Sequence, residues 1–195
     1  MDEKHNIRSW IKFKASEIVI QMVVVVISII LALAVDEWRD ERKQQELANR
    51  SERSILEELK ANQQELDVSL AINDSIFRSI VVVLQNKTEH KGGVPFSYAQ
   101  LSTAAWKMAQ GTQALYRIDF NRLLLFARVY ELQTLYGTHQ SKLLENLGQS
   151  WDQNKEAMQR IKRKLVFELA TVNEVGKALV KQYCEALMDS ISVKK

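Results

Sequence analysis

The chain has 195 residues, of which 46% are hydrophobic and 26% charged, and its formal net charge is +3. Because Lys and Arg are spread among nearly as many acidic residues, this charge argues against a nucleic-acid partner. A single cysteine, Cys184, excludes an intramolecular disulfide. Long stretches without Gly or Pro are rich in good helix formers, and no run alternates like a half-buried strand. The sequence therefore predicts an all-α protein.

Residues 18–35 form an apolar segment that contains no charge, glycine or proline. A helix of this length covers roughly 27 Å, close to the hydrocarbon thickness of a bilayer, and satisfies its own backbone groups in lipid. Only Gln21 and Ser28 interrupt the apolar surface, whereas a buried core helix normally carries a polar stripe. Trp10 and Trp38 flank the segment, where indole rings favour the headgroup region. We expect a transmembrane helix, with the lipid bilayer as partner.

A cleaved signal peptide is the alternative interpretation of this segment. The tail of residues 1–17 is basic, and Ala32-Leu33-Ala34 has the small-x-small form of a cleavage site, so cleavage after Ala34 stays open. The apolar run exceeds the about 7–15 residues of a signal-peptide core, which favours an uncleaved signal anchor. Positive charges are balanced on the two sides, so orientation stays open. A short tail before a large domain favours export of the C-terminal part.

The helix is expected to continue beyond the apolar segment. Residues 36–55 are mostly charged or polar and predict a solvated helical stalk, followed by a bundle domain over 56–195. An apolar seam at alternating steps of three and four predicts coiled-coil pairing with a helix of the same chain or of a second copy. The amide side chains of Gln63 and Asn73 on this seam either fix the register of the helix pair or lie at a partly solvated edge of the bundle. The seam consists of Leu56, Leu59, Gln63, Leu66, Leu70, Asn73, Phe77, Ile80 and Leu84.

Three further helices are predicted. A Gly-Gly pair and the single proline break the chain between residues 88 and 97, and Ser97 with Gln100 has the form of a capping box that starts a helix ending at Gly111. Asp119 is a plausible N-cap for a helix over 120–147. Another helix is expected over 151–191, with one stripe formed by Met158, Ile161, Leu165, Leu169, Val172, Gly176, Leu179 and Tyr183. Short connections make an antiparallel bundle the simplest packing.

Two passages resemble an uncharacterised family of bacterial single-span membrane proteins. The first is the aliphatic span that ends in Ala-Leu-Ala-Val-Asp-Glu-Trp38 and continues into Arg-Asp-Glu-Arg-Lys43; the second is Ala104-Ala105-Trp106 with the later Val129-Tyr130-Glu131-Leu132-Gln133. Gln21 departs from the all-aliphatic span of that family. The resemblance implies a bacterial single-span membrane protein with an N-terminal anchor and a helical C-terminal domain. Together with the export favoured by the short tail, this places the expected anchor in the inner membrane and the C-terminal domain in the periplasm. The family has no assigned activity, so the resemblance implies no chemistry.

No catalytic or metal-binding pattern is present in the sequence. His5, His90 and His139 are far apart and Cys184 stands alone, so neither a metal site nor a Cys-His nucleophile is indicated. The carboxylates of the stalk alternate with Arg and Lys, as on a solvated helix surface. We therefore expect no enzyme activity, no metal and no cofactor.

One group of residues in the middle of the chain has two interpretations. Aromatic rings beside an Arg and acidic residues suit a small-ligand pocket, as in helical sensor domains, or equally the aromatic core of a bundle. The group consists of Trp106, Tyr116, Arg117, Asp119, Tyr130 and Glu131.

The function expected from these features is that of a non-enzymatic, membrane-anchored helical bundle. It would act as an assembly, interaction or accessory subunit, with a second copy or another membrane protein as partner and no nucleic acid. The alternative is a ligand-binding, sensor-type bundle that works with a separate signalling subunit.

Overall fold

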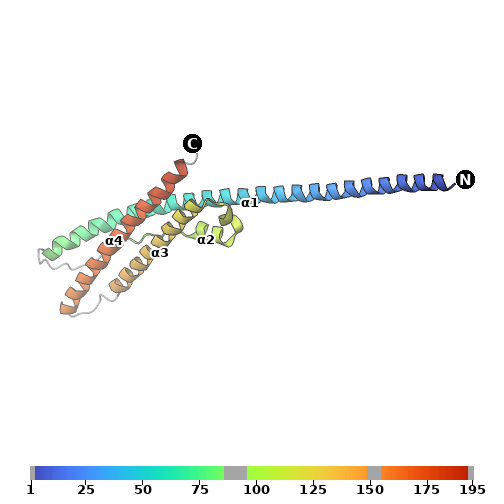
Figure 1. The fold of residues 1–195 in the computed structure, drawn as a ribbon. Coiled ribbons are helices and arrows are strands. Elements are labelled where there is room, and N and C mark those ends of the chain that lie inside the picture. The colour runs from blue at the N-terminus through green and yellow to red at the C-terminus, as the bar shows by residue number, and fades with distance from the viewer. Residues whose placement is uncertain (1–2, 86–95, 149–154, 193–195) are drawn as a thin grey trace. The chain divides into compact units, whose positions relative to one another are not determined.

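The fold is described here from a computed structural model. It describes the backbone of residues 3–85, 96–148 and 155–192 and the side chains of 19–82, 96–146 and 164–189. No strand occurs in these ranges, and the prediction of an all-α protein is confirmed. The elements are α1 (Glu3–Gln85), α2 (Ala104–Gly111), the short 3₁₀ helix η1 (Gln113–Arg117), α3 (Phe120–Gly148) and α4 (Lys155–Ser192) (Figure 1).

The chain divides into two compact units, Met1–Leu47 and Ala48–Lys195. In the first unit every described side chain from Val19 to Lys43 is exposed. Among the described helices, α1 is the one with a stretch long and apolar enough to cross a membrane, and that stretch lies near the N-terminus. The second unit begins at Ala48, inside the segment expected to be a stalk, because Ala48 and Ile55 are already buried.

The core of the second unit comes from one face each of α1, α3 and α4. Ile55, Leu59 and Leu66 recur at helical spacing on α1, and the predicted stripe on α4 is buried at Leu165, Leu169, Val172, Leu179 and Tyr183. The largest fully buried side chains of α3 are Phe126, Val129, Tyr136 and Gln140.

The helices α3 and α4 pack directly against each other, with only residues 149–154 between them in the sequence (Figure 1). The path from α1 to α3 is different, because residues 96–103 form an extended segment that runs back along α1. Its start bonds to Asn73 and its end to Asn62, so it runs antiparallel to α1. Gln133 of α3 also bonds to the end of the segment.

The expected helix start at Ser97 is wrong, because the described helix begins at Ala104. In a capping box, side chains at the start of a helix bond to nearby backbone N–H groups. In this segment the backbone groups instead bond to side chains of α1, which lies far away in the sequence. The backbone of Ser97 and that of Ser102 each bond to an asparagine on α1, and these bonds hold the segment extended. The predicted end of this helix at Gly111 is confirmed.

The expected N-cap of α3 is confirmed. Asp119 Oδ1 accepts hydrogen bonds from the backbone N–H groups of Asn121 at 2.9 Å and Arg122 at 3.2 Å. Gly137 lies inside α3 without ending it, and a Cβ there would meet nothing within 4 Å. Gly176 on α4 is different, because its Cβ would lie 2.6 Å from Leu70 Cδ2 and 3.0 Å from Tyr136 Cε2. The absence of a side chain at Gly176 therefore lets α4 approach both other helices.

Candidate functional site

The most elaborate polar arrangement in the second unit is a set of four buried amide side chains, which we call the amide clamp. Each of these amides forms a hydrogen bond with the backbone of the extended segment 96–103. Two come from α1 and two from α3: Asn62, Asn73, Gln133 and Gln140.

Two asparagines of the clamp each pair with both backbone groups of one residue. Asn73 Oδ1 accepts from Ser97 N at 2.8 Å, and its Nδ2 donates to Ser97 O at 2.9 Å. Asn62 makes the same pair of bonds with Ser102, each 2.8 Å long. A carboxamide presents one donor side and one acceptor side, as a peptide group does, so it replaces the neighbouring strand that an extended backbone otherwise requires.

The glutamines of the clamp act from α3. In the amide orientation that pairs donors with acceptors, Gln140 accepts from Ala99 N at 2.9 Å and donates to Ala99 O at 3.2 Å. Gln133 Nε2 donates to Ser102 O at 2.8 Å, while its Oε1 accepts from the buried Tyr183 hydroxyl at 2.7 Å. The clamp therefore links the extended segment to α1, α3 and α4.

Glu58 on α1 lies at the start of α2. Its Oε2 accepts from Ser102 Oγ at 2.6 Å and from Ala105 N at 3.0 Å, and its Oε1 accepts from the Tyr130 hydroxyl at 2.6 Å. Thr103, the residue before α2, makes no side-chain cap, so the carboxylate supplies one from another helix. Burial alone raises the pKa of Glu58, but these bonds outweigh it and hold the pKa below its ordinary value.

Three buried tyrosines surround the clamp, and burial is the main reason that each pKa is raised. For Tyr130 the hydrogen bond to Glu58 and the charge of that carboxylate raise the pKa further. Burial raises the pKa of Tyr136 to about 12, although a hydrogen bond with Ser69 partly offsets this rise. Burial also raises the pKa of Tyr183. These phenols therefore stay protonated and act as hydrogen-bond donors at neutral pH.

The six residues considered for a ligand pocket do not form a buried cluster, because four of them are exposed. Trp106 and Tyr130 stack with ring centroids 5.1 Å apart, and Tyr130 is buried in the core. Tyr116 is 88% exposed, Asp119 caps α3, and Arg117 and Glu131 are exposed. Only the stacked pair fits the core interpretation.

The predicted pairing seam of α1 faces its own chain. Leu66 and Asn73 are buried, while Leu70, Phe77 and Ile80 pack half-buried against the same core. Gln63 Nε2 donates to Cys184 Sγ of α4 at 3.2 Å. The side chain of Leu84 lies outside the described residues.

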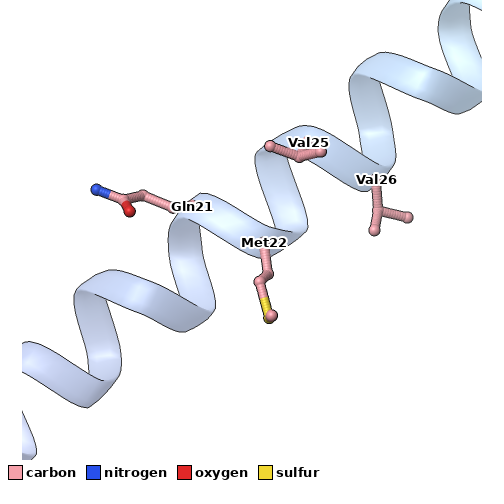
Figure 2. Close-up of a pocket in the computed structure, with 4 residues that line it drawn as sticks. All are labelled: Gln21, Met22, Val25 and Val26. Carbon is pink, nitrogen blue, oxygen red and sulfur yellow. The ribbon is translucent and has the colours of Figure 1, made fainter.

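A shallow hollow on the apolar part of α1 is lined by Gln21, Met22, Val25 and Val26, all from this one helix (Figure 2). Because all of its lining residues belong to one helix, it is a feature of the helix surface. Ser28 Oγ in the same stretch donates to Val24 O at 2.8 Å.

Among the side chains of residues 19–82, 96–146 and 164–189, no group of three His, Cys, Asp or Glu is placed to hold a metal ion. The chain matches no family model, no curated protein and no solved structure. The amide clamp was not anticipated from the sequence. A signal was present, because Asn62 and Asn73 are about three helical turns apart, and Gln133 and Gln140 about two, which places each pair on one face.

Proposed function

We propose that the protein is a non-enzymatic, single-pass membrane protein whose helical domain acts as an assembly, interaction or accessory subunit. The uncleaved N-terminal helix serves as a signal anchor in a bacterial inner membrane, and the domain from Ala48 onwards lies in the periplasm. We also propose that the chain belongs to the uncharacterised family of bacterial single-span membrane proteins that it resembles at the aliphatic span and around Trp106.

The observation that carries the proposal is the exposure of the apolar stretch of α1. Every side chain from Val19 to Val35 is exposed, although all but two of these residues are aliphatic or Met. Water disfavours a surface of this kind and length, and a bilayer removes the penalty. The second unit has a hydrophobic core of its own.

The non-enzymatic role is supported by how the second unit uses its buried polar groups. The amide clamp is occupied by the backbone of segment 96–103, and Glu58 already accepts bonds from three partners. A general base works best with a pKa near the working pH, and the lowered pKa of this carboxylate does not meet that demand. No feature of the described residues favours the ligand-binding alternative, since Tyr116, Arg117 and Glu131 are exposed.

Membrane insertion and topology are tested on the full chain expressed in bacterial cells. A Cys184→Ser background with Met108→Cys places one thiol on a side chain that is 73% exposed in the second unit. We expect the chain to resist alkaline carbonate extraction and the new thiol to react with a membrane-impermeant maleimide once the outer membrane is permeabilised. Carbonate release would refute the anchor, and reaction only after inner-membrane lysis would refute the periplasmic domain.

The assembly role is tested by chemical cross-linking in native membranes, followed by mass spectrometry of the captured species. A recurrent species that contains a second copy or one other membrane protein is expected. A chain that stays uncross-linked and sediments as a monomer in mild detergent would contradict this role.

A further inference from the structure

The apolar stretch of α1 contains one face that differs from the rest of its surface. Gln21, Val25, Ser28, Ala32 and Val35 follow steps of four and three, and at about 100° per residue they lie within an arc of about 80°. Apart from Ala34, all other residues from 19 to 35 are Ile, Val, Leu or Met. We call these five residues the span face.

The amide of Gln21 is the one polar group of the span face without a partner inside the helix. Ser28 satisfies its hydroxyl on Val24 O, whereas the Gln21 side chain makes no hydrogen bond with any described residue. In Figure 2 the amide projects away from the helix, on the same side as Val25, with Met22 and Val26 on the other side. An unpaired amide in hydrocarbon is costly, so this group requires a partner from outside the chain.

We propose that the span face pairs with the span face of a second copy of this chain in the bilayer. A carboxamide carries a donor and an acceptor, so two Gln21 side chains related by a two-fold axis satisfy each other. The smaller side chains of Ser28 and Ala32 allow two helix backbones to approach closely, as at other interfaces within membranes. The steps of three and four suit a left-handed helix pair.

The rest of the molecule favours this location for self-association. The other heptad seam of the chain, around Leu66 and Asn73, is already covered by its own helices and by the extended segment. All five side chains of the span face are exposed. The inference rests on the proposed membrane anchoring and deepens it, since it names the partner and the surface.

The test is disulfide cross-linking of the full chain in proteoliposomes, in a Cys184→Ser background. Ser28→Cys places a thiol at the centre of the span face, and Ile30→Cys places one at nearly the same depth on the opposite side. We expect copper-phenanthroline to convert the Ser28→Cys chain to a covalent dimer at least several-fold faster than the Ile30→Cys chain. Equal rates at the two positions, or no dimer at either, would overturn the proposal.

The role of the amide is tested by adding Gln21→Leu to the Ser28→Cys chain, with Val23→Leu as the control. Loss of the paired amides is expected to weaken association by about 3- to 30-fold, measured by energy transfer between labelled chains as lipid is added. The control variant is expected to associate like its parent. An unchanged association with Gln21→Leu would show that the amide reaches the headgroups instead, and would overturn the proposed pairing.

Carbonate extraction of the same samples separates the two proposals. Chains that stay in the membrane but give no face-specific dimer refute only the pairing of the span faces. Chains that are extracted refute the anchor and the pairing together. Cross-links to a different protein at Ser28→Cys would also refute the second copy as the partner.

Discussion

The hydroxyl of Tyr130 on α3 donates to Glu58 Oε1 on α1 at 2.6 Å. The other oxygen of the same carboxylate accepts hydrogen bonds from Ala105 N in the first turn of α2 and from Ser102 Oγ at the end of the extended segment. One side chain therefore joins four parts of the second unit. The ring of Tyr130, which donates to this carboxylate, also stacks on Trp106 of α2.

Replacing the carboxylate should change how stability depends on pH. The folded pKa of Glu58 lies below the ordinary value of 4.5, so its contribution is present above that value and is lost as the pH falls through the folded pKa. We expect Glu58→Gln to destabilise the domain by about 1–3 kcal/mol at pH 7 and to flatten the acid limb of the stability profile below about pH 4.5. Urea unfolding between pH 3 and pH 7 measures both effects. Glu57→Gln, at an exposed neighbour, is the control, and equal profiles for the two variants would contradict the assigned bonds.

The buried phenols predict a second pH dependence, at the alkaline end. Because the folded pKa of Tyr130 is raised above its ordinary value of 10, its contribution is complete below that value and is lost as the pH rises above it. Tyr130→Phe is expected to cost about 1–2 kcal/mol at neutral pH and to reduce the alkaline loss of stability. Thermal unfolding between pH 8 and pH 11 checks this, with Tyr116→Phe at an 88% exposed position as the control. An alkaline limb identical to that of the unmodified chain would refute the prediction.

The hydrogen bonds of the amide clamp predict that replacing a single asparagine destabilises the extended segment. Asn73→Ala leaves Ser97 N without its side-chain acceptor, while Ser97 O keeps the bond that Ser69 Oγ donates, so the change should cost about 1–3 kcal/mol. Asn73→Asp keeps the acceptor but loses the donor, so its cost should be intermediate near neutral pH. Hydrogen exchange at the amide of Ser97 should accelerate in both variants. Gln64→Ala, on the exposed side of α1, should leave exchange and stability unchanged.

Two glycines inside helices provide a matched pair of substitutions. Gly137→Ala should stabilise the domain by about 0.5–1 kcal/mol, because a Cβ meets nothing there and alanine favours the helix. Gly176→Ala gains the same helix propensity but forces the new Cβ against Leu70 and the ring of Tyr136, so a net loss of about 1–2 kcal/mol is expected. Thermal melts of the two variants in parallel are sufficient. A stabilising Gly176→Ala would show that Leu70 moves aside without cost.

The sequence predicted the features that depend on local patterns. The all-helical fold, the cap at Asp119 and the buried stripe on α4 follow from side chains a few residues apart along one helix. The apolar stretch of α1 was evident for the same reason, since its composition alone distinguishes it.

The features that the sequence did not reveal depend on pairs of residues far apart in the chain. The bonds from Asn73 to Ser97 and from Glu58 to Ser102 join residues that no local pattern connects, so the capping-box form of Ser97 and Gln100 suggested a helix instead. The aromatic group was misleading for a similar reason. Proximity in sequence placed Tyr116 beside Trp106, although its ring is exposed in the folded domain.

The most direct test of the membrane anchor is the depth of α1 in a bilayer. In a Cys184→Ser background, an environment-sensitive fluorophore is attached at Val26→Cys in the apolar stretch or at Met108→Cys in the second unit, and the full chain is reconstituted with spin-labelled lipids. We predict strong quenching at position 26 by labels deep in the acyl chains and none at position 108. No quenching at position 26, with the chain recovered free of lipid, would contradict the account.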